Sequence, residues 1–255
     1  MLPAERLKRI ADLLARDGSV KIDALAREFR VSEMTVRRDL EKCEQMGLLD
    51  RCYGGGVIKK ELTPELSVLE RHTYNMEIKR RLAEKCASFV KPGDVIYLDA
   101  GTTMRCLASL LLQVPDLQIV TNDLFVAHEL IESDAQVYVL GGPLQKSSGS
   151  MIGEAVTRAV GQMRFDIAFT GAAAISDEWT VMTPTQEKTF LKRMVCNRAN
   201  SSYLVVDDSK FHLQAMHRVN GLEDYTGVVT NATFSGEEQM TLRKRRVNII
   251  FVEGM

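Results

Sequence analysis

The segment from Lys21 to Arg51 constrains the fold more than any other part of the chain. Its first half places apolar side chains at the i, i+3, i+4 and i+7 positions of one helical face, at Ile22, Leu25, Ala26 and Phe29. Ser32 then marks a new helix start, because serine is a favoured N-cap and Val31 can pack on Val36 one turn later. Two short amphipathic helices around a tight break indicate a helix-turn-helix.

The second of these helices would turn Val36, Leu40 and Cys43 inward and its N-terminal polar side chains outward. In a helix-turn-helix, such outward side chains enter the major groove of DNA. We therefore predict DNA contacts from Ser32, Met34, Thr35, Arg37 and Arg38. We expect Arg38 to contact a guanine and Arg37 to reach a phosphate. The alternative is that both arginines form only a solvated face.

A glycine-tipped hairpin is predicted to follow the helix-turn-helix. Residues 4–16 add a further helical pattern before it, and the hairpin runs from a strand at 48–53 through a turn at 54–56 to 57–58. Three helices and such a hairpin describe a winged helix over residues 1–60. A wing commonly lies along the phosphate backbone, where we place Arg51, Lys59 and Lys60.

The composition of the chain limits the classes of protein to which it can belong. The chain has 255 residues, 45% of them hydrophobic and 26% charged, which suits one large globular domain or a small and a medium one, and we favour the second. No apolar run approaches the ~18 residues of a transmembrane helix, and the N-terminus lacks the apolar core of a signal peptide. The five cysteines are widely spaced without a C-x-x-C pair, which favours free thiols over a zinc site. We expect a cytoplasmic protein that needs no cofactor or metal.

The net charge of −1 hides a modest asymmetry between the two parts of the chain. Residues 1–60 carry 13 basic and 10 acidic side chains, whereas residues 61–255 carry 20 basic and 24 acidic ones. An ordinary solvated surface would explain this excess equally well. The prediction of DNA binding therefore rests on the motif and not on the charge.

After a linker predicted at 61–76, residues 77–255 alternate short apolar runs with helical patterns. The predicted strands are 95–98, 117–120, 137–140, 165–169, 203–206, 228–229 and 247–252. The predicted helices begin with the Ile78, Leu82, Cys86 and Phe89 pattern and continue at 103–112, 123–133, 153–162, 185–199 and 235–244. This alternation predicts an α/β domain with a doubly wound, mainly parallel sheet.

Small and polar residues follow these strands, where the ligand site of a doubly wound sheet lies. Gly101, Thr102 and Thr103 open a helix and would favour a phosphate, and Lys210 is a natural cationic partner for it. Asp99 and Asn122 could accept and donate hydrogen bonds with the hydroxyls of a polyol. Each of these segments can also be explained without a ligand. The helix start can be ordinary capping, Gly141 and Gly142 can form a turn, and the loop at Lys210 can be a solvated segment.

Taken together, these motifs resemble the DeoR family of bacterial transcription regulators. They are VSEMTVRRDL with the wing, then Asp99–Thr103, Thr121 with Asn122, Gly141 with Gly142, and Asp208–Phe211, in the family's order over essentially the whole chain. The resemblance implies a winged helix and an effector domain similar to ribose-5-phosphate isomerase. It further implies a repressor of a carbohydrate-use operon that oligomerises through that domain and responds to a phosphorylated sugar or sugar-like metabolite.

Carried onto this chain, the family's effector site would consist of residues at the strand ends. They are Asp99, Gly101, Thr102, Thr103, Thr121, Asn122, Gly141, Gly142 and Lys210. Two departures stand out. Tyr53 occupies the wing position where the family commonly has histidine, and the turn at 171–175 lacks the acidic residue that many members carry there. The second departure leaves the identity of the effector open.

Two alternatives stay beside the regulator. A sugar-phosphate isomerase fused to a DNA-binding head would need a general base, for which Glu187 is the candidate because the turn at 171–175 offers none. A protein-interaction module with a vestigial pocket would bind no sugar phosphate. The sequence alone leaves open whether the effector induces or co-represses, which operator is bound, and whether the protein is a dimer or a tetramer.

Overall fold

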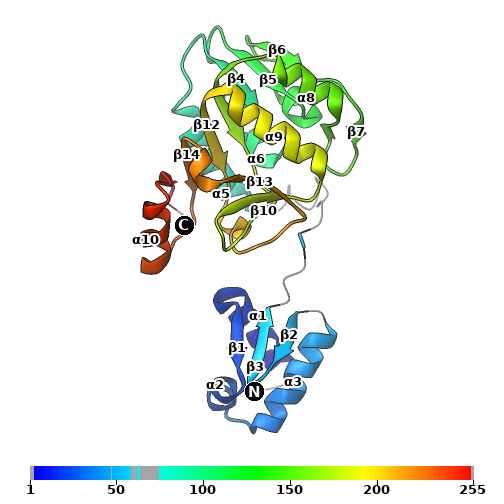
Figure 1. Cartoon of the computed structure of the whole chain (residues 1–255), viewed down its shortest axis with the longest axis vertical. Helices are drawn as coiled ribbons and strands as arrows, with labels where there is room; N and C mark the ends of the chain where they lie inside the picture. The colour runs from blue at the N-terminus through cyan, green and yellow to red at the C-terminus, as the bar shows by residue number, and fades with distance from the viewer. Residues whose placement is uncertain (1–2, 47, 59–61, 64–74, 254–255) are drawn as a thin grey trace. The chain divides into compact units, whose positions relative to one another are not determined.

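The chain divides into two compact units, Met1–Glu61 and Leu62–Met255. The structure is a computed structural model that describes residues 3–46, 48–58, 62–63 and 75–253 (Figure 1). Most of the linker predicted at 61–76 therefore lies outside the described residues, as do Lys59 and Lys60.

The N-terminal unit packs helices beside a small antiparallel sheet. Its elements are α1 (Pro3–Asp17), β1 (Ser19–Lys21), α2 (Ile22–Phe29), α3 (Glu33–Gln45), β2 (Leu49–Cys52) and β3 (Gly55–Ile58). The strands lie in the order β1-β3-β2 with antiparallel pairing throughout. The predicted winged helix is confirmed. The sequence pattern did not indicate β1, because three residues are too few to show an alternation.

One apolar cluster and one buried ion pair hold these helices together. Ile10, Leu25, Phe29 and Leu40 come from all three helices and are at most 4% exposed. Beside them the Arg6 guanidinium on α1 donates two hydrogen bonds to the Asp39 carboxylate on α3, at 2.6 and 3.2 Å. Both side chains of the pair are buried, so the ion pair is part of the interior of this unit.

The C-terminal unit is built on a parallel sheet. Among the described residues its seven strands lie in the order β15-β14-β12-β9-β4-β5-β6, and every neighbouring pair is parallel. The strands are β4 (Val95–Leu98), β5 (Gln118–Thr121), β6 (Gln136–Val139), β9 (Phe165–Thr170), β12 (Ala199–Val205), β14 (Gly227–Thr230) and β15 (Ile249–Phe251). Each falls on a predicted strand, which confirms the α/β fold class.

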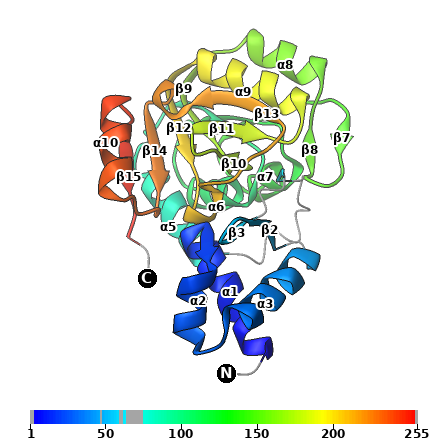
Figure 2. The same ribbon diagram turned by 60° about the horizontal axis from the view of Figure 1, so that its bottom comes forward.

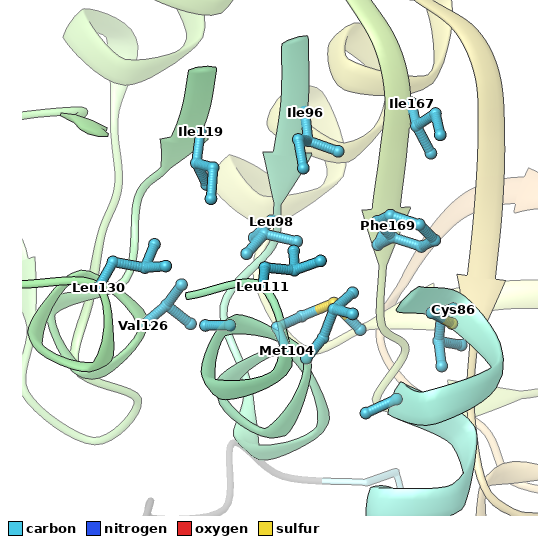
Figure 3. Close-up of a cluster of buried hydrophobic side chains, with 14 of the residues drawn as sticks. Cys86, Ile96, Leu98, Met104, Leu111, Ile119, Val126, Leu130, Ile167 and Phe169 are labelled. Atoms are coloured by element: carbon cyan, nitrogen blue, oxygen red, sulfur yellow. The ribbon is translucent and has the colours of Figure 1, made fainter. Parts of the chain in front are cut away.

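Helices cover both faces of this sheet (Figures 1 and 2). Their bounds are α5 (Met76–Ala87), α6 (Thr102–Leu110), α7 (Leu124–Glu129), α8 (Glu154–Gly161), α9 (Gln186–Arg198) and α10 (Gly236–Lys244). Because side chains alternate along a strand, Ile96 and Leu98 pack towards α5, α6 and α7 (Figure 3), whereas Tyr97 packs towards α8 and α9. Within the described part of the chain, no helix is both long and apolar enough to cross a membrane.

The C-terminal unit also contains shorter strands and turns outside the parallel sheet. They are the hairpin of β7 (Leu144–Gln145) and β8 (Ser150–Met151), the antiparallel sheet of β10 (Ala174–Ile175), β11 (Thr180–Thr183) and β13 (His217–Gly221), and the 3-10 turns η1 (Asp208–Lys210) and η2 (Leu222–Asp224). The sequence did not predict these strands, because most of them are too short or too polar to show a pattern.

The order of the strands fixes where a ligand site can form. From β4 the chain builds outward through β5 and β6, then returns to the other side of β4 and builds outward through β9, β12, β14 and β15. The winding therefore reverses between β4 and β9. In a doubly wound sheet, the crevice at the carboxyl ends of such strands is the usual place for a ligand.

Candidate functional site

The exposed face of α3 is the first candidate site. Its inward side chains, Val36, Leu40 and Cys43, are at most 1% exposed, as the helical pattern predicted. Met34 on the opposite face is 61% exposed. Arg37 and Arg38 are exposed as well. The N-terminal half of α3 is therefore free to offer side chains to a groove of DNA.

Ser32 fixes the start of this helix. Its Oγ accepts a hydrogen bond from the Thr35 amide at 3.3 Å and lies 3.0 Å from the Thr35 hydroxyl oxygen. The preceding Val31 packs on the cluster that contains Val36. This is the predicted N-cap arrangement, so Ser32 sets where α3 begins and how Thr35 is held.

We expect Ser32→Ala to lower the free energy of unfolding of the N-terminal unit by about 1 kcal/mol, because it removes an N-cap acceptor. Urea denaturation followed by circular dichroism measures this loss. Ser32→Asn is the matched control, since asparagine caps as well as serine and should stay within a few tenths of a kcal/mol of the wild type. Equal losses in the two variants would contradict a capping role.

The arginines near this face differ in their partners. Arg37 lies 3.7 Å from the Glu33 carboxylate. Arg51 on β2 contacts Glu41 at 3.0 Å and Glu44 at 3.9 Å, so it joins the hairpin to α3. Among the described residues Arg38 has no recorded ion pair. These exposed pairs are weak, but they leave Arg38 as the arginine most readily available to a base.

The hairpin after α3 has the geometry of a wing. Gly54 at its tip has φ +86°, which a side chain rarely adopts, and the neighbouring Tyr53 is fully exposed. A Cβ atom on Gly55 would lie 2.0 Å from the Val20 carbonyl oxygen, so glycine is required where β3 passes β1. The predicted phosphate contacts of Arg51, Lys59 and Lys60 stay predictions, and the two lysines lie outside the described residues.

A cavity of about 420 Å³ is the second candidate site. It lies in the C-terminal unit where β4, β9 and β12 end and where α6 and η1 begin. Six of the predicted effector residues line it: Asp99, Gly101, Thr102, Thr103, Asn122 and Lys210. Its volume falls in the range of small-molecule sites, about 300–1,000 Å³.

The Asp99 carboxylate is a buried polar group in the lining of the cavity. Its Oδ2 atom accepts hydrogen bonds from the Gly171 amide at 3.0 Å and from the Lys192 ammonium. Lys192 also donates to the Gly171 carbonyl oxygen at 2.8 Å. The ends of β4 and β9 and the middle of α9 are thereby tied together at the floor of the cavity.

Cations and a helix terminus surround this floor. Lys79 on α5, Lys188 on α9 and Lys210 on η1 all line the cavity. Asp207 lines it too, and its Oδ1 accepts from the Ser209 amide at 3.0 Å, which shapes the turn that carries Lys210. The cavity therefore combines positive charge with two carboxylates that hydrogen bonds hold in place, those of Asp99 and Asp207.

Three predicted effector residues lie away from the lining of this cavity. Thr121 is fully buried, and its hydroxyl oxygen accepts from the Asp123 amide at 3.1 Å. Gly141 and Gly142 form an exposed turn after β6. Asn122 lines the cavity, but its amide is already used: Tyr97 donates to it at 2.9 Å and it donates to the Met151 carbonyl oxygen at 2.8 Å.

Sequence reasoning missed the lysines of α5 and α9. Lys79 precedes Leu82, Ala83 and Cys86 on the buried face of α5, and it is only 5% exposed. In α9, Lys188 lines the cavity as well, and the sequence analysis did not assign it to the site. A lysine on the apolar stripe of an amphipathic helix is the signal that could have found them, because a buried lysine needs a partner.

A winged helix-turn-helix followed by an α/β unit with a charged cavity is the architecture of a two-domain transcription regulator. Residues 6–61 match the DeoR-like helix-turn-helix domain, and residues 74–232 match the DeoR C terminal sensor domain. The chain belongs to the DeoR family. It is a DNA-binding transcriptional regulator, as the sequence predicted.

Relatives that match over nearly their whole length are also named as transcription regulators or repressors. The HTH-type transcriptional regulator FruR of Bacillus subtilis is 34% identical over 96% of this chain and 98% of its own length. The lactose phosphotransferase system repressor of Streptococcus mutans is 32% identical over 91% of this chain and 93% of its own. The glycerol-3-phosphate regulon repressor of Escherichia coli is 31% identical over 91% and 92%.

Among solved structures, the ribose 5-phosphate isomerase A of Methanocaldococcus jannaschii matches 54% of this chain and 55% of its own, with 18% identity and a TM-score of 0.40. The isomerase alternative is not supported, because the full-length relatives are named regulators and repressors. Glu187, its candidate base, is exposed on α9 and is not among the residues that line the cavity.

Proposed function

We propose that this regulator represses a carbohydrate-use operon and that a phosphorylated sugar or sugar-like metabolite, bound in the cavity of the C-terminal unit, controls its DNA binding. The observation that carries the proposal is the cavity itself, which joins lysines and a helix N-terminus to a fixed carboxylate. The names of the lactose phosphotransferase and glycerol-3-phosphate repressors support sugar and sugar-phosphate metabolism as the setting.

The phosphate would bind at the start of α6. Arg105 is the first residue of this helix whose amide bonds to the carbonyl of a residue four before it, Gly101. Among the described residues, no backbone acceptor is recorded for the amides of Thr102 and Thr103. Such amides and the positive end of the helix dipole favour an anion. Gly101, with φ +148°, gives a backbone conformation that a side chain would strain. Lys210 supplies the opposing charge.

Control of DNA binding requires a difference in affinity. The effector must bind the DNA-competent and DNA-incompetent states of the protein unequally, and it then shifts the population towards the state it prefers. The family default is an inducer, which releases the repressor from its operator. We propose this direction here.

The effector role of Lys210 is tested by Lys210→Met. Loss of a charge-assisted contact is expected to weaken the binding of sugar monophosphates by about 10- to 150-fold. Isothermal titration calorimetry against a panel of phosphorylated sugars measures this change. Lys146→Met is the matched control, because Lys146 is exposed and does not line the cavity. Unchanged affinity in Lys210→Met would remove Lys210 from the site.

We further propose a cytoplasmic homo-oligomer. The support for self-association is the edge strand β6, where Tyr138 and Val139 are 40% and 47% exposed. Among the described residues β6 pairs only with β5, so its other edge is open, and an open apolar edge strand is a natural site of association. Light scattering on the purified protein gives the oligomeric state, and a monomer at micromolar concentration would contradict this part of the proposal.

A further inference from the structure

The C-terminal unit begins with a segment that lines its own cavity. Glu61 is the last residue of the N-terminal unit, and Leu62 is the first residue of the C-terminal unit. Thr63 comes next and lines the cavity together with Lys210, whereas the other described residues of the lining begin at Lys79. We call Leu62 and Thr63 the junction segment. Along the chain, it is the part of the cavity nearest to the DNA-binding unit.

A main-chain contact holds the junction segment in place. The Thr63 amide donates a hydrogen bond to the Gln214 carbonyl oxygen at 2.7 Å, and Leu62 pairs with Gln214 as in a parallel sheet. Pro64 follows in the sequence, and the residue before a proline prefers an extended backbone. The sequence at this point therefore favours the conformation that the pairing requires. Because the contact uses backbone atoms, a side chain other than proline at position 63 permits it.

The acceptor of this hydrogen bond belongs to the loop that carries Lys210. We call Asp208–Gln214 the effector loop; it begins with η1. In its middle, Phe211 is 6% exposed and pairs with Ile175, and the Leu213 amide donates to the Ile175 carbonyl oxygen at 3.1 Å. Leu213 also lines the cavity. One loop therefore joins the cationic group of the cavity to the acceptor that holds the junction segment.

The effector loop is fixed at His212 as well. This residue has φ +60°, a left-handed conformation that a residue other than glycine keeps only when its surroundings impose it. Its imidazole lies 3.0 Å from the Asp177 carboxylate and 3.5 Å from that of Glu238. A loop held in this way has few means of absorbing a displacement at one of its ends.

Resting on the proposed function, we propose that Thr63 is a ligand-contacting residue of the effector site and that the junction segment conveys ligand binding to the DNA-binding unit. A ligand bound between Lys210 and Thr63 contacts the segments on both sides of the bond from Thr63 to Gln214. It therefore binds more tightly to the form of the protein in which this bond is made.

The held and released forms of the junction segment are then the two states between which the ligand selects. One backbone hydrogen bond changes such an equilibrium by only about 2- to 12-fold, so both forms are accessible without the ligand. The chain enters the N-terminal unit from a fixed point in the held form and from a freer one in the released form. The held form is the one that binds the operator weakly, in line with an inducing ligand.

The first test uses hydrogen exchange of the wild-type protein, followed by mass spectrometry. The ligand is the tightest binder found by calorimetry among glucose 6-phosphate, fructose 6-phosphate, fructose 1-phosphate and glycerol 3-phosphate. It is expected to slow exchange both at the start of α6 and in the junction segment, where Pro64 contributes no amide. Slower exchange at the start of α6 with unchanged exchange at Leu62 and Thr63 would overturn the proposal.

The second test compares two substitutions of Thr63. Thr63→Pro removes the amide that bonds to Gln214, whereas Thr63→Ala keeps this amide and removes only the hydroxyl group. Operator DNA is titrated with and without a saturating concentration of the same ligand. The ligand is expected to weaken operator binding by about 5- to 150-fold in the wild type and by less than about 2-fold in Thr63→Pro. Thr63→Ala should respond nearly as the wild type does.

Calorimetry on Thr63→Ala tests the contact with the ligand. Loss of one neutral hydrogen bond is expected to weaken binding by about 2- to 12-fold. Unchanged affinity would show that the ligand does not contact the Thr63 hydroxyl group and would contradict that part of the proposal. If Thr63→Ala lost the response to the ligand as fully as Thr63→Pro, the backbone bond to Gln214 would not be the element that conveys binding.

The outcomes also separate this inference from the proposed function. If no phosphorylated sugar binds the wild-type protein, the proposed function fails. If the ligand binds and weakens operator binding equally in the wild type and in Thr63→Pro, the proposed function stands and only the role of the junction segment is wrong. If Thr63→Pro fails to fold, hydrogen exchange of the wild type still decides.

Discussion

Asp39→Ala is expected to destabilise the N-terminal unit by about 3–5 kcal/mol, because it removes the carboxylate from a buried guanidinium. Asp39 is 3% exposed and Arg6 is 8% exposed. The Arg6 guanidinium donates hydrogen bonds to the Asp39 carboxylate, and this contact raises the pKa of Arg6 above its usual value. Arginine is charged at neutral pH even without such a contact, so Arg6 keeps its charge when Asp39 is lost. A unit of this size has a stability of only about 3–9 kcal/mol. Most of its DNA binding should therefore disappear.

Tryptophan fluorescence and circular dichroism follow the unfolding of the two units separately in this experiment. The single tryptophan, Trp179, is buried in the C-terminal unit, so its fluorescence in urea should change little. Circular dichroism should show an early transition of the N-terminal unit. The matched control replaces both partners, Arg6→Leu with Asp39→Leu, because an apolar pair of similar volume can be neutral or better. A double variant as unstable as Asp39→Ala would contradict the ion-pair explanation.

Arg38→Ala is expected to lower the affinity for the operator by about 1–3 kcal/mol and to leave binding to random DNA nearly unchanged. A bidentate contact between arginine and guanine contributes discrimination of that size. Arg38 is exposed on α3 and has no recorded ion pair among the described residues. Titrations of operator and random duplexes at one salt concentration measure the two affinities, since both depend steeply on salt.

Arg37→Ala serves as the comparison. Arg37 is expected to contact a phosphate, so its loss should weaken operator and random DNA to a similar extent and reduce the salt dependence by about one charge. If Arg38→Ala behaved in the same way, its role in reading bases would be wrong. If both variants bound like the wild type, the two arginines would be only a solvated face.

The regular elements of this protein could be predicted from the sequence because their patterns are local. The apolar period of 22–29 and the N-cap at Ser32 depend on neighbouring residues, and α2 and α3 form there. The inner strands of the parallel sheet are largely buried on both faces and appear as apolar runs such as 95–98. Strands of two or three residues, such as β1 and β10, are set by their partners and carry no pattern of their own.

The cavity was predicted only in part, for a related reason. Asp99 directly follows β4 and Lys210 lies in the turn after β12, so both could be assigned to the sheet edge from their position in the sequence. Lys192 could not, because its role depends on an aspartate 93 residues away and on the carbonyl group of Gly171. Gly141 and Gly142 follow a strand too, but β6 is the edge strand and its end lies away from the lining of the cavity.

A phosphorylated sugar bound in the C-terminal unit is expected to change the affinity of the N-terminal unit for DNA. The most direct measurement is a titration of operator DNA, at fixed salt, with and without a saturating sugar monophosphate chosen by calorimetry. The ligand is expected to weaken operator binding of the wild type by about 5- to 150-fold, the usual span of allosteric coupling. Lys210→Met at the same ligand concentration should respond much less. Operator affinity that stays constant while the ligand is bound would contradict control of DNA binding by this cavity.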